Sequence, residues 1–210
     1  MGLAVEDPNA SGTCLTDVEG IILAAGLSKR AGVFKLTLEL DGKTILERCI
    51  EGMCGFCSRL IIVCGYRAAE ILPIIKRYPR AEPVMNIDYM DGMYSSVLKG
   101  LENLRCGSGS GRFFLTPGDY PLISPVVYEK MLAADGDIIV PSCYGKNGHP
   151  VLIKSRIANE IAGSGYYSLK DFIDSWGYTK LEVQDRGILL DVDTIEDYEQ
   201  IRRDYSELSF

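Results

Sequence analysis

The sequence predicts an α/β protein with a three-layer α/β/α, Rossmann-like architecture built on a mostly parallel mixed sheet. Short apolar runs alternate along the chain with segments in which apolar residues recur every three or four positions. The apolar runs are nearly continuous, which is typical of strands that helices cover on both faces. A length of 210 residues suits one domain with a sizeable core and is short for two.

We expect residues 1–17 to form a loosely ordered N-terminal extension and residues 18–210 to form a single domain. The extension has neither a basic flank nor an apolar stretch, so it does not resemble a secretory signal. No stretch of the chain approaches the roughly 18 consecutive apolar residues of a membrane span. We therefore expect a cytoplasmic location and no membrane partner.

In the first half of the chain, short apolar runs predict strands and three- or four-residue apolar spacing predicts helices. The strands are expected over residues 18–24, 59–64 and 83–86, and the helices over residues 44–54, 68–78 and 94–104. Each strand is thus followed by a helix, which is the connection that a parallel sheet requires.

In the second half the same two patterns continue. They predict strands over residues 113–116, 137–141, 150–153, 181–183 and 188–192, and helices over residues 125–134, 170–176 and 194–205. Ser124 and Pro125 give the helix over residues 125–134 an N-cap followed by proline at its first position.

Polar segments follow four of the predicted strands at the point where each strand ends. These segments are residues 26–35, 65–67, 86–93 and 117–121. Open α/β sheets bind ligands in the crevice at the carboxyl ends of their strands. We therefore expect these segments to build one ligand site.

The loop after the first strand is the strongest functional signal in the sequence. Glycines at positions 26 and 32 let backbone N–H groups approach an anion, and Arg30 and Lys35 can offset its charge. Arg30 can grip phosphate through its forked geometry, whereas Lys35 acts as a point charge. The spacing fits neither the dinucleotide fingerprint nor the P-loop. We interpret the loop as a polyphosphate site; the alternative is that both cations are ordinary surface charges.

Two carboxylates are candidates for a magnesium site. Asp119 follows an apolar run and lies in a turn with Pro117, Gly118 and Pro121, where it could serve as a metal ligand or only hydrogen-bond its own backbone. Asp193, favoured over Asp191, precedes the last helix and could be the second ligand. The alternative is that these aspartates only cap that helix.

Charge and cysteine content exclude other classes. The net charge of −7, without a run of Lys or Arg, argues against a nucleic-acid partner. An odd number of cysteines, seven, favours reduced thiols. Cys54 and Cys57 lack the second ligand pair of a zinc site, so we interpret them as small apolar residues.

Two further positions remain open on their residues alone. Ser95 or its neighbour Ser96 could cap a helix or reach a nucleotide. His149, the only histidine, could be a base or a hydrogen-bonded structural residue.

Five segments resemble, in order, the molybdenum-cofactor nucleotidyltransferases, which comprise the molybdopterin cytidylyl- and guanylyltransferases. These segments are residues 23–35, 91–101, 117–121, 147–152 and 190–198. Ala24-Ala25-Gly26 and Gly148-His149-Pro150 are similar to the cytidylyl branch. Two positions depart from the pattern: Ala31 replaces the methionine that usually follows the loop arginine, and Gly165-Tyr166 replaces a Gly-Asp pair near the pterin side.

The resemblance implies a fold of the nucleotide-diphospho-sugar transferase type and a role for each matching residue. Arg30, Lys35 and Asp119 would be catalytic, Asp119 and Asp193 would bind Mg²⁺, and His149 and Tyr166 would lie on the acceptor side. The nucleotide would contact Leu23, Ala24, Ala25, Gly26, Ser28, Arg30, Lys35, Gly65 and Ser95.

The implied activity is Mg²⁺-dependent transfer of CMP from CTP to a phosphorylated acceptor, molybdopterin, with release of pyrophosphate. A molybdoenzyme or its maturation factor is a further expected partner. One alternative is a cytidylyltransferase or nucleotide-sugar pyrophosphorylase acting on a small phosphosugar or phosphoalcohol. Another is a non-catalytic nucleotide-binding accessory protein. A nicotinamide-dependent oxidoreductase is disfavoured because the Gly-x-Gly-x-x-Gly spacing is missing.

Overall fold

A computed structural model describes residues 18–27, 32–105 and 111–208. The expected extension over residues 1–17 lies outside the described residues. The main sheet has the strand order β10-β7-β9-β6-β1-β4-β5, with β8 paired to β7. Its strands are β1 (Val18–Ala24), β4 (Arg59–Cys64), β5 (Ala81–Met85), β6 (Arg112–Pro117), β7 (Ile138–Cys143), β8 (Lys146–Asn147), β9 (Val151–Lys154) and β10 (Thr179–Glu182).

The sheet is mixed but mostly parallel, as the sequence predicts. Strand β1 lies in the interior of the sheet and runs parallel to both neighbours, β4 and β6. Strand β9 is inserted between β6 and β7 and runs antiparallel to both. In this register Leu23 lies beside Val63 on one side and beside Pro117 on the other. The carboxyl ends of β1, β4 and β6 therefore meet at one edge of the sheet.

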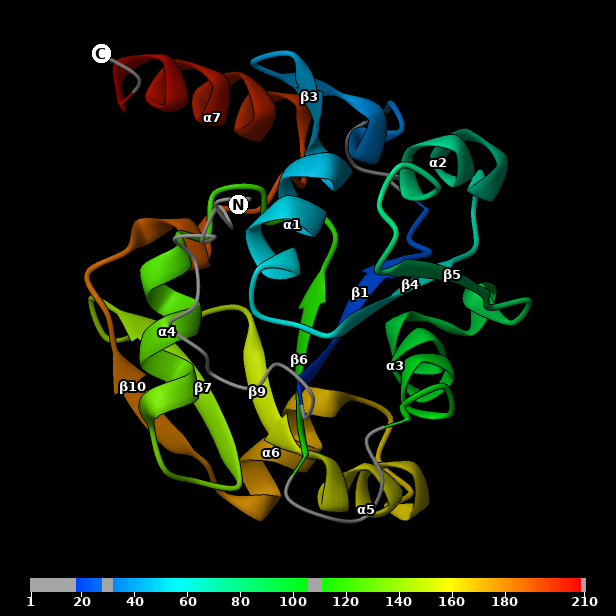
Figure 1. Cartoon of the computed structure of the whole chain (residues 1–210), viewed down its shortest axis with the longest axis vertical. Helices are drawn as coiled ribbons and strands as arrows, with labels where there is room; N and C mark the ends of the chain where they lie inside the picture. Colours follow the sequence, from blue (N-terminus) through cyan, green and yellow to red (C-terminus); the bar gives the residue numbers. More distant parts are fainter. Residues whose placement is uncertain (1–17, 28–31, 106–110, 209–210) are drawn as a thin grey trace, which may run out of the picture.

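Helices cover both faces of the sheet (Figure 1). The α-helices of the described residues are α1 (Ile45–Cys54), α2 (Ala68–Ile75), α3 (Met93–Leu101), α4 (Pro125–Ala133), α5 (Ala158–Gly163), α6 (Leu169–Trp176) and α7 (Ile195–Leu208). One core cluster includes residues of α1, α2 and α4, and the other includes residues of α3, α5 and α6. Successive residues of β1 alternate between the two, with Ile22 in the first cluster and Ile21 in the second.

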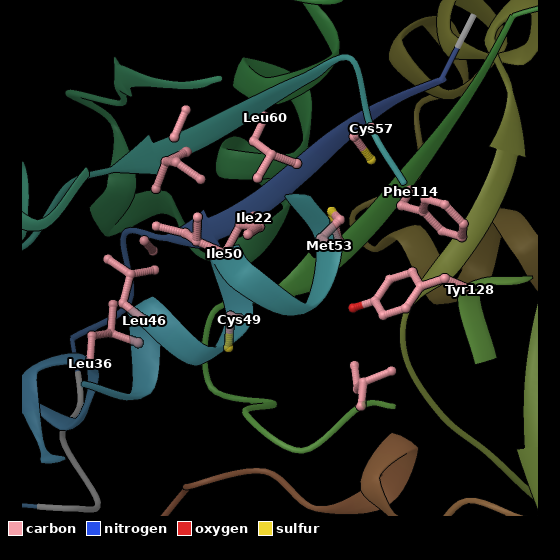
Figure 2. Packing of buried hydrophobic residues seen from close by; sticks show 14 of the residues in the cluster. Ile22, Leu36, Leu46, Cys49, Ile50, Met53, Cys57, Leu60, Phe114 and Tyr128 are labelled. Atoms are coloured by element: carbon pink, nitrogen blue, oxygen red, sulfur yellow. The ribbon is translucent and has the colours of Figure 1, made fainter. Parts of the chain in front are cut away.

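The first core cluster is densely filled, and Figure 2 shows Ile50 and Met53 of α1 facing Ile22 and Leu60. Cys57 is buried in this cluster and Cys54 packs against it, and neither is in a disulfide. Helix α1 begins with a capping box, because Thr44 accepts from the Glu47 N–H and the Glu47 side chain accepts from the Thr44 N–H. Apolar periodicity and the cap therefore agree on where α1 starts.

A third, smaller cluster joins the C-terminal helix to the hairpin of β2 (Glu39–Leu40) and β3 (Lys43–Thr44). Leu40 and Ile45 pack against Tyr198 and Ile201 of α7. The Tyr198 hydroxyl also donates a 2.6 Å hydrogen bond to the Glu39 carbonyl oxygen. Figure 1 shows α7 and the hairpin side by side at the top of the molecule. The hairpin, β8 and α5 are absent from the sequence prediction.

The prediction of a strand over residues 188–192 is wrong. The segment forms the 3₁₀ helix η5 (Arg186–Leu189) and then an irregular stretch. The Asp185 side chain accepts a 2.7 Å hydrogen bond from the Gly187 N–H, which turns the chain at this point. Ile188 and Val192 are nevertheless fully buried, because they pack against other loops and helices. Burial, and not strand pairing, explains their apolar character.

No helix within the described ranges is both long and apolar enough to span a membrane.

Candidate active site

Two adjoining cavities lie at the edge of the sheet where β1 and β6 end. The acidic cavity, of about 330 Å³, is lined by Gly26, Lys35, Ser96, Asp119 and Asp193 among others. The aromatic cavity, of about 440 Å³, is lined by Tyr94, Tyr120, His149, Tyr167 and Tyr178 among others. Leu23, Met93 and Pro117 belong to both cavities and form their shared wall. A molecule in one cavity would thus lie directly beside a molecule in the other.

Lys35 connects two acidic residues that are far away in the sequence. It begins the 3₁₀ helix η2 (Lys35–Thr37). Its Nζ donates to Asp119 Oδ2 at 2.5 Å and to Asp193 Oδ1 at 3.2 Å. Burial disfavours the charged form of Lys35, but the two carboxylates outweigh this effect and raise its pKa above the usual value. Lys35 therefore remains a cation at neutral pH.

Asp119, Asp191 and Asp193 form a cluster whose carboxylate oxygens lie within 4.8 Å of one another. Asp119 Oδ1 is buried and has no hydrogen-bond partner among the described residues. Burial, together with the charges of Asp119 and Asp193, raises the pKa of Asp191. Three carboxylates share the single positive charge of Lys35, and hard oxygen ligands with excess negative charge fit a divalent cation such as Mg²⁺. Asp119, with Asp193 or Asp191, is thus equipped to hold such an ion.

Local backbone contacts bring these acidic residues together. The Gly118 N–H donates to the Leu23 carbonyl oxygen at 2.9 Å, which extends the pairing of β6 with β1 as far as Asp119. The Val192 N–H then donates to the Asp119 carbonyl oxygen at 3.0 Å and fixes the 191–193 segment beside it. The end of one strand therefore positions both parts of the cluster.

Helix α7 has a cap that does not use the clustered aspartates. Thr194 Oγ1 accepts from the Asp197 N–H at 3.1 Å, and the Asp197 side chain accepts from the Thr194 N–H at 2.8 Å. The helix is therefore capped by Thr194 and Asp197, which argues against the alternative that Asp191 and Asp193 only cap the helix.

The expected nucleotide loop lines the acidic cavity where it is described. Leu23, Ala25, Gly26 and Lys35 are cavity residues, whereas Ala24 points into the first core cluster. Ser28 and Arg30 lie outside the described residues, so their expected contacts remain predictions.

Gly65 allows its own segment to approach the nucleotide loop at Ala25 and the 3₁₀ helix at Tyr89 closely. A Cβ atom at this position would lie 2.8 Å from Cβ of both Ala25 and Tyr89. The Tyr66 N–H also donates to the Ala25 carbonyl oxygen at 3.3 Å. Gly65 therefore shapes the cavity through packing.

The two adjacent serines have different positions. Ser95 Oγ accepts from Asn86 Nδ2 at 2.9 Å and lies 2.8 Å from the Gly92 carbonyl oxygen, to which it can donate. Ser96 also accepts from Asn86, at 3.0 Å, and lines the acidic cavity. Ser95 therefore holds the loop before α3 in place, whereas Ser96 faces the acidic cavity.

The sequence places residues 86–93 at the ligand site but does not single out Tyr89 or Met90 of the 3₁₀ helix η3 (Tyr89–Asp91). Tyr89 and Met90 line the acidic cavity together with Gly92 and Met93. The sequence signal for this turn is Gly92. Its φ of 99° is a backbone conformation that favours glycine, and it ends the 3₁₀ helix directly before α3.

His149 lies in the wall of the aromatic cavity, with its ring 4.7 Å from that of Tyr120. Burial lowers the pKa of His149 to about 4, although a hydrogen bond with the backbone of Leu115 acts in the opposite direction. The ring is therefore neutral at pH 7 and too weakly basic for efficient general-base catalysis there.

Tyr166 lies near the aromatic cavity without lining it. Its ring packs edge-on against Phe172 at a centroid distance of 6.1 Å. The next residue, Tyr167, does line the cavity, as do Asn147 and Tyr178. Asn147 begins the segment 147–152 but was not singled out, and Tyr167 and Tyr178 belong to none of the five resembling segments.

Comparison with known proteins supports this picture. The MobA-like NTP transferase domain family matches residues 20–178. The molybdenum cofactor cytidylyltransferase of Escherichia coli K12 is 29% identical over 196 residues, covering 92% of this chain and 100% of that protein. The nicotine blue oxidoreductase of Paenarthrobacter nicotinovorans is 28% identical over 200 residues, covering 88% of this chain and 96% of that protein.

The fold is also similar to that of a solved protein from Mycobacterium tuberculosis H37Rv. The TM-score is 0.76 at 22% identity, covering 90% of this chain and 99% of that one. A manganese complex of the same protein gives a TM-score of 0.70 at 20% identity with the same coverage. Because the family match spans most of the chain and the matched segment includes Lys35 and Asp119, the chain belongs to the MobA-like NTP transferase domain family and is a nucleotidyltransferase.

Proposed function

We propose that this nucleotidyltransferase transfers CMP from CTP to a phosphorylated acceptor, molybdopterin, in a Mg²⁺-dependent reaction that releases pyrophosphate. The observation that carries the proposal is the shared wall between the two cavities. One cavity has the cation and carboxylates that a triphosphate with its metal requires, and the other offers an aromatic environment for the acceptor. The reacting groups would meet between them.

Lys35 would bind the triphosphate once the nucleotide enters. Its ammonium group already faces the acidic cavity, and phosphate oxygens can replace the carboxylates as its partners. Arg30 would add a forked contact from the loop. Asp119 and Asp193 would hold Mg²⁺, which when bound neutralises phosphate charge. Asp119 Oδ1 is buried without a hydrogen-bond partner in the part of the chain that the structure describes, which supports a role for Asp119 as a metal ligand.

The reaction needs no nucleophile or base from the protein. A phosphate oxygen of the acceptor forms a bond to the α-phosphorus, and the bond from that phosphorus to the bridging oxygen breaks. Pyrophosphate leaves with the bonding electrons. Since the acceptor phosphate is already ionised at neutral pH, the protein contributes orientation and charge compensation. A neutral His149 is compatible with this chemistry.

Two observations support CTP and molybdopterin. The E. coli relative, which aligns over its whole length, is named a molybdenum cofactor cytidylyltransferase. Ala25, which resembles the cytidylyl branch, lines the acidic cavity. A molybdoenzyme or its maturation factor would then receive the product.

The test measures pyrophosphate release with CTP, GTP, ATP and UTP, each with Mg²⁺, in the presence and absence of molybdopterin. Release that requires both CTP and the pterin would support the proposal. Release from CTP with a small phosphosugar or phosphoalcohol, and none with molybdopterin, would contradict the acceptor. Because one relative is named an oxidoreductase, oxidation of NADH and NADPH is measured in parallel. Steady oxidation without pyrophosphate release would contradict the proposed nucleotidyl transfer.

Matched variants connect this activity to the site. Lys35→Gln should strongly reduce turnover, whereas Lys130→Gln, on the exposed side of α4, should not. Equal activity of the two variants would contradict the assignment of Lys35.

A further inference from the structure

We propose that the aromatic cavity binds a planar heteroaromatic ring of the acceptor, with Tyr167 covering one face of the ring and the Asn147–Tyr178 pair contacting its edge. The inference rests on the proposed function in placing the acceptor in this cavity. It goes beyond that function by assigning the residues that select the acceptor.

The walls of the cavity suit a flat, largely uncharged group. Val97, Leu115, Val140 and Val151 supply an apolar surface from four elements of the fold. Tyr94 and Tyr178 add aromatic rings. A volume of about 440 Å³ lies within the range of small-molecule sites.

The charges in the cavity also disfavour a second phosphate. Among the described lining residues, Lys170 is the only lysine or arginine, and its Nζ is 2.5 Å from Asp174 Oδ2. His149 contributes no positive charge at neutral pH. The one phosphate of the acceptor would therefore lie at the shared wall, close to Lys35, with the ring extending away from it.

Tyr167 is placed to cover the ring. It lines the cavity although its relative exposure is 94%, so its aromatic face is available. The residues around it are anchored on both sides. Tyr94 Oη donates to the Ile161 carbonyl oxygen at 2.8 Å, and Ser168 Oγ accepts from the Asp171 N–H at 3.1 Å to cap α6. A ring bound beneath Tyr167 would remove much of this exposed aromatic surface from water.

Asn147 and Tyr178 offer complementary polar groups in the lining of the cavity. Asn147 Nδ2 donates to Tyr178 Oη at 2.8 Å. The pair therefore presents the Asn147 carbonyl oxygen as an acceptor beside the Tyr178 hydroxyl as a donor. Adjacent donor and acceptor groups match the edge of a heterocycle that carries an amide and a ring nitrogen.

The test is a calorimetric titration of 6-hydroxymethylpterin, a neutral pterin without phosphate, in the absence of nucleotide. We expect wild type and Tyr167→Phe to bind equally and Tyr167→Ala to bind about tenfold more weakly, as expected for loss of one stacking partner. Tyr144→Ala is the matched control, because Tyr144 is 80% exposed and lies outside the cavity lining. It should bind like wild type. Tyr178→Phe should weaken binding about fivefold by removing the donor.

The outcomes separate this inference from the proposed function. Equal affinity of Tyr167→Ala and wild type, or no pterin binding by wild type, would overturn the inference. Unchanged affinity of Tyr178→Phe would overturn the edge contact. CTP binding with Mg²⁺ is measured on the same samples. Pterin binding that depends on Tyr167, without any CTP binding, would refute the proposed function and leave this inference standing.

Discussion

Replacing Lys35 with methionine should destabilise the metal-free protein and make its stability strongly dependent on Mg²⁺. Methionine has a similar length but removes the charge that lies between Asp119 and Asp193. The Lys35 and Asp119 side chains are only 14% and 13% exposed, so water screens their interaction incompletely. Without Lys35, three carboxylates within 4.8 Å of one another would face each other uncompensated.

The size of the effect follows from this geometry. Two unit charges about 4 Å apart interact by about 4 kcal/mol at an effective dielectric constant of about 20. Exposed ion pairs contribute less than about 1 kcal/mol, whereas removing one partner of a buried pair costs about 3–5 kcal/mol. For this nearly buried group we expect a loss of about 3 kcal/mol in the free energy of unfolding.

Urea unfolding followed by circular dichroism, with EDTA and then with Mg²⁺, measures this loss. Under the proposed function, Mg²⁺ would bind the cluster in the folded state only, so it should stabilise Lys35→Met more than wild type and reduce the difference between them. Lys130→Met, at an exposed position of α4, should unfold like wild type in both conditions. A Lys35→Met protein that is as stable as wild type in EDTA would refute the electrostatic reasoning.

Three further predictions concern the surrounding framework. Gly187→Ala should lower the free energy of unfolding by about 3 kcal/mol in urea titrations, because its Cβ would lie 2.0 Å from the Leu122 carbonyl oxygen. Burial raises the pKa of Glu47, but hydrogen bonds from Thr44 and nearby cations lower it by more, so the pKa lies below the usual 4.5. Its contribution to stability is therefore present above about pH 4.5 and lost as pH falls through the lower folded value, and Glu47→Gln should flatten this part of the pH–stability profile. Gly65→Ala should raise the KM for CTP in the pyrophosphate assay with little change in far-ultraviolet circular dichroism, since crowding would displace the nucleotide loop.

The sequence predicts the central elements well because burial and hydrogen bonding agree there. Ile21 and Ile22 are both fully buried in β1, on opposite faces, so a continuous apolar run correctly indicates a covered strand. Ile188 and Val192 are equally buried but belong to a turn and a loop. An apolar run reports that residues are buried and does not report which backbone groups they pair with.

The residues of the candidate site also fall into two groups, those that the sequence could identify and those that it could not. Lys35, Asp119 and Asp193 could be identified because they lie in the loop after the first strand, in the turn after β6 and directly before the last helix, and the structure brings the three together. The roles of Tyr167 and Asn147 could not be identified, because both residues line the aromatic cavity only through the way that β8 and the segment before α6 are folded. Only tertiary structure supplies that information.

The most direct test of the central claim compares Mg²⁺-dependent pyrophosphate release from CTP and molybdopterin by wild type, Asp119→Asn and Asp135→Asn. Asn keeps the size of Asp119 and removes the charge that would hold the metal, whereas Asp135 is exposed on a loop outside both cavities. We expect Asp119→Asn to lose at least about 100-fold in kcat/KM and Asp135→Asn to match wild type. Near wild-type turnover by Asp119→Asn, with Mg²⁺ still required, would contradict the placement of the catalytic metal at this cluster.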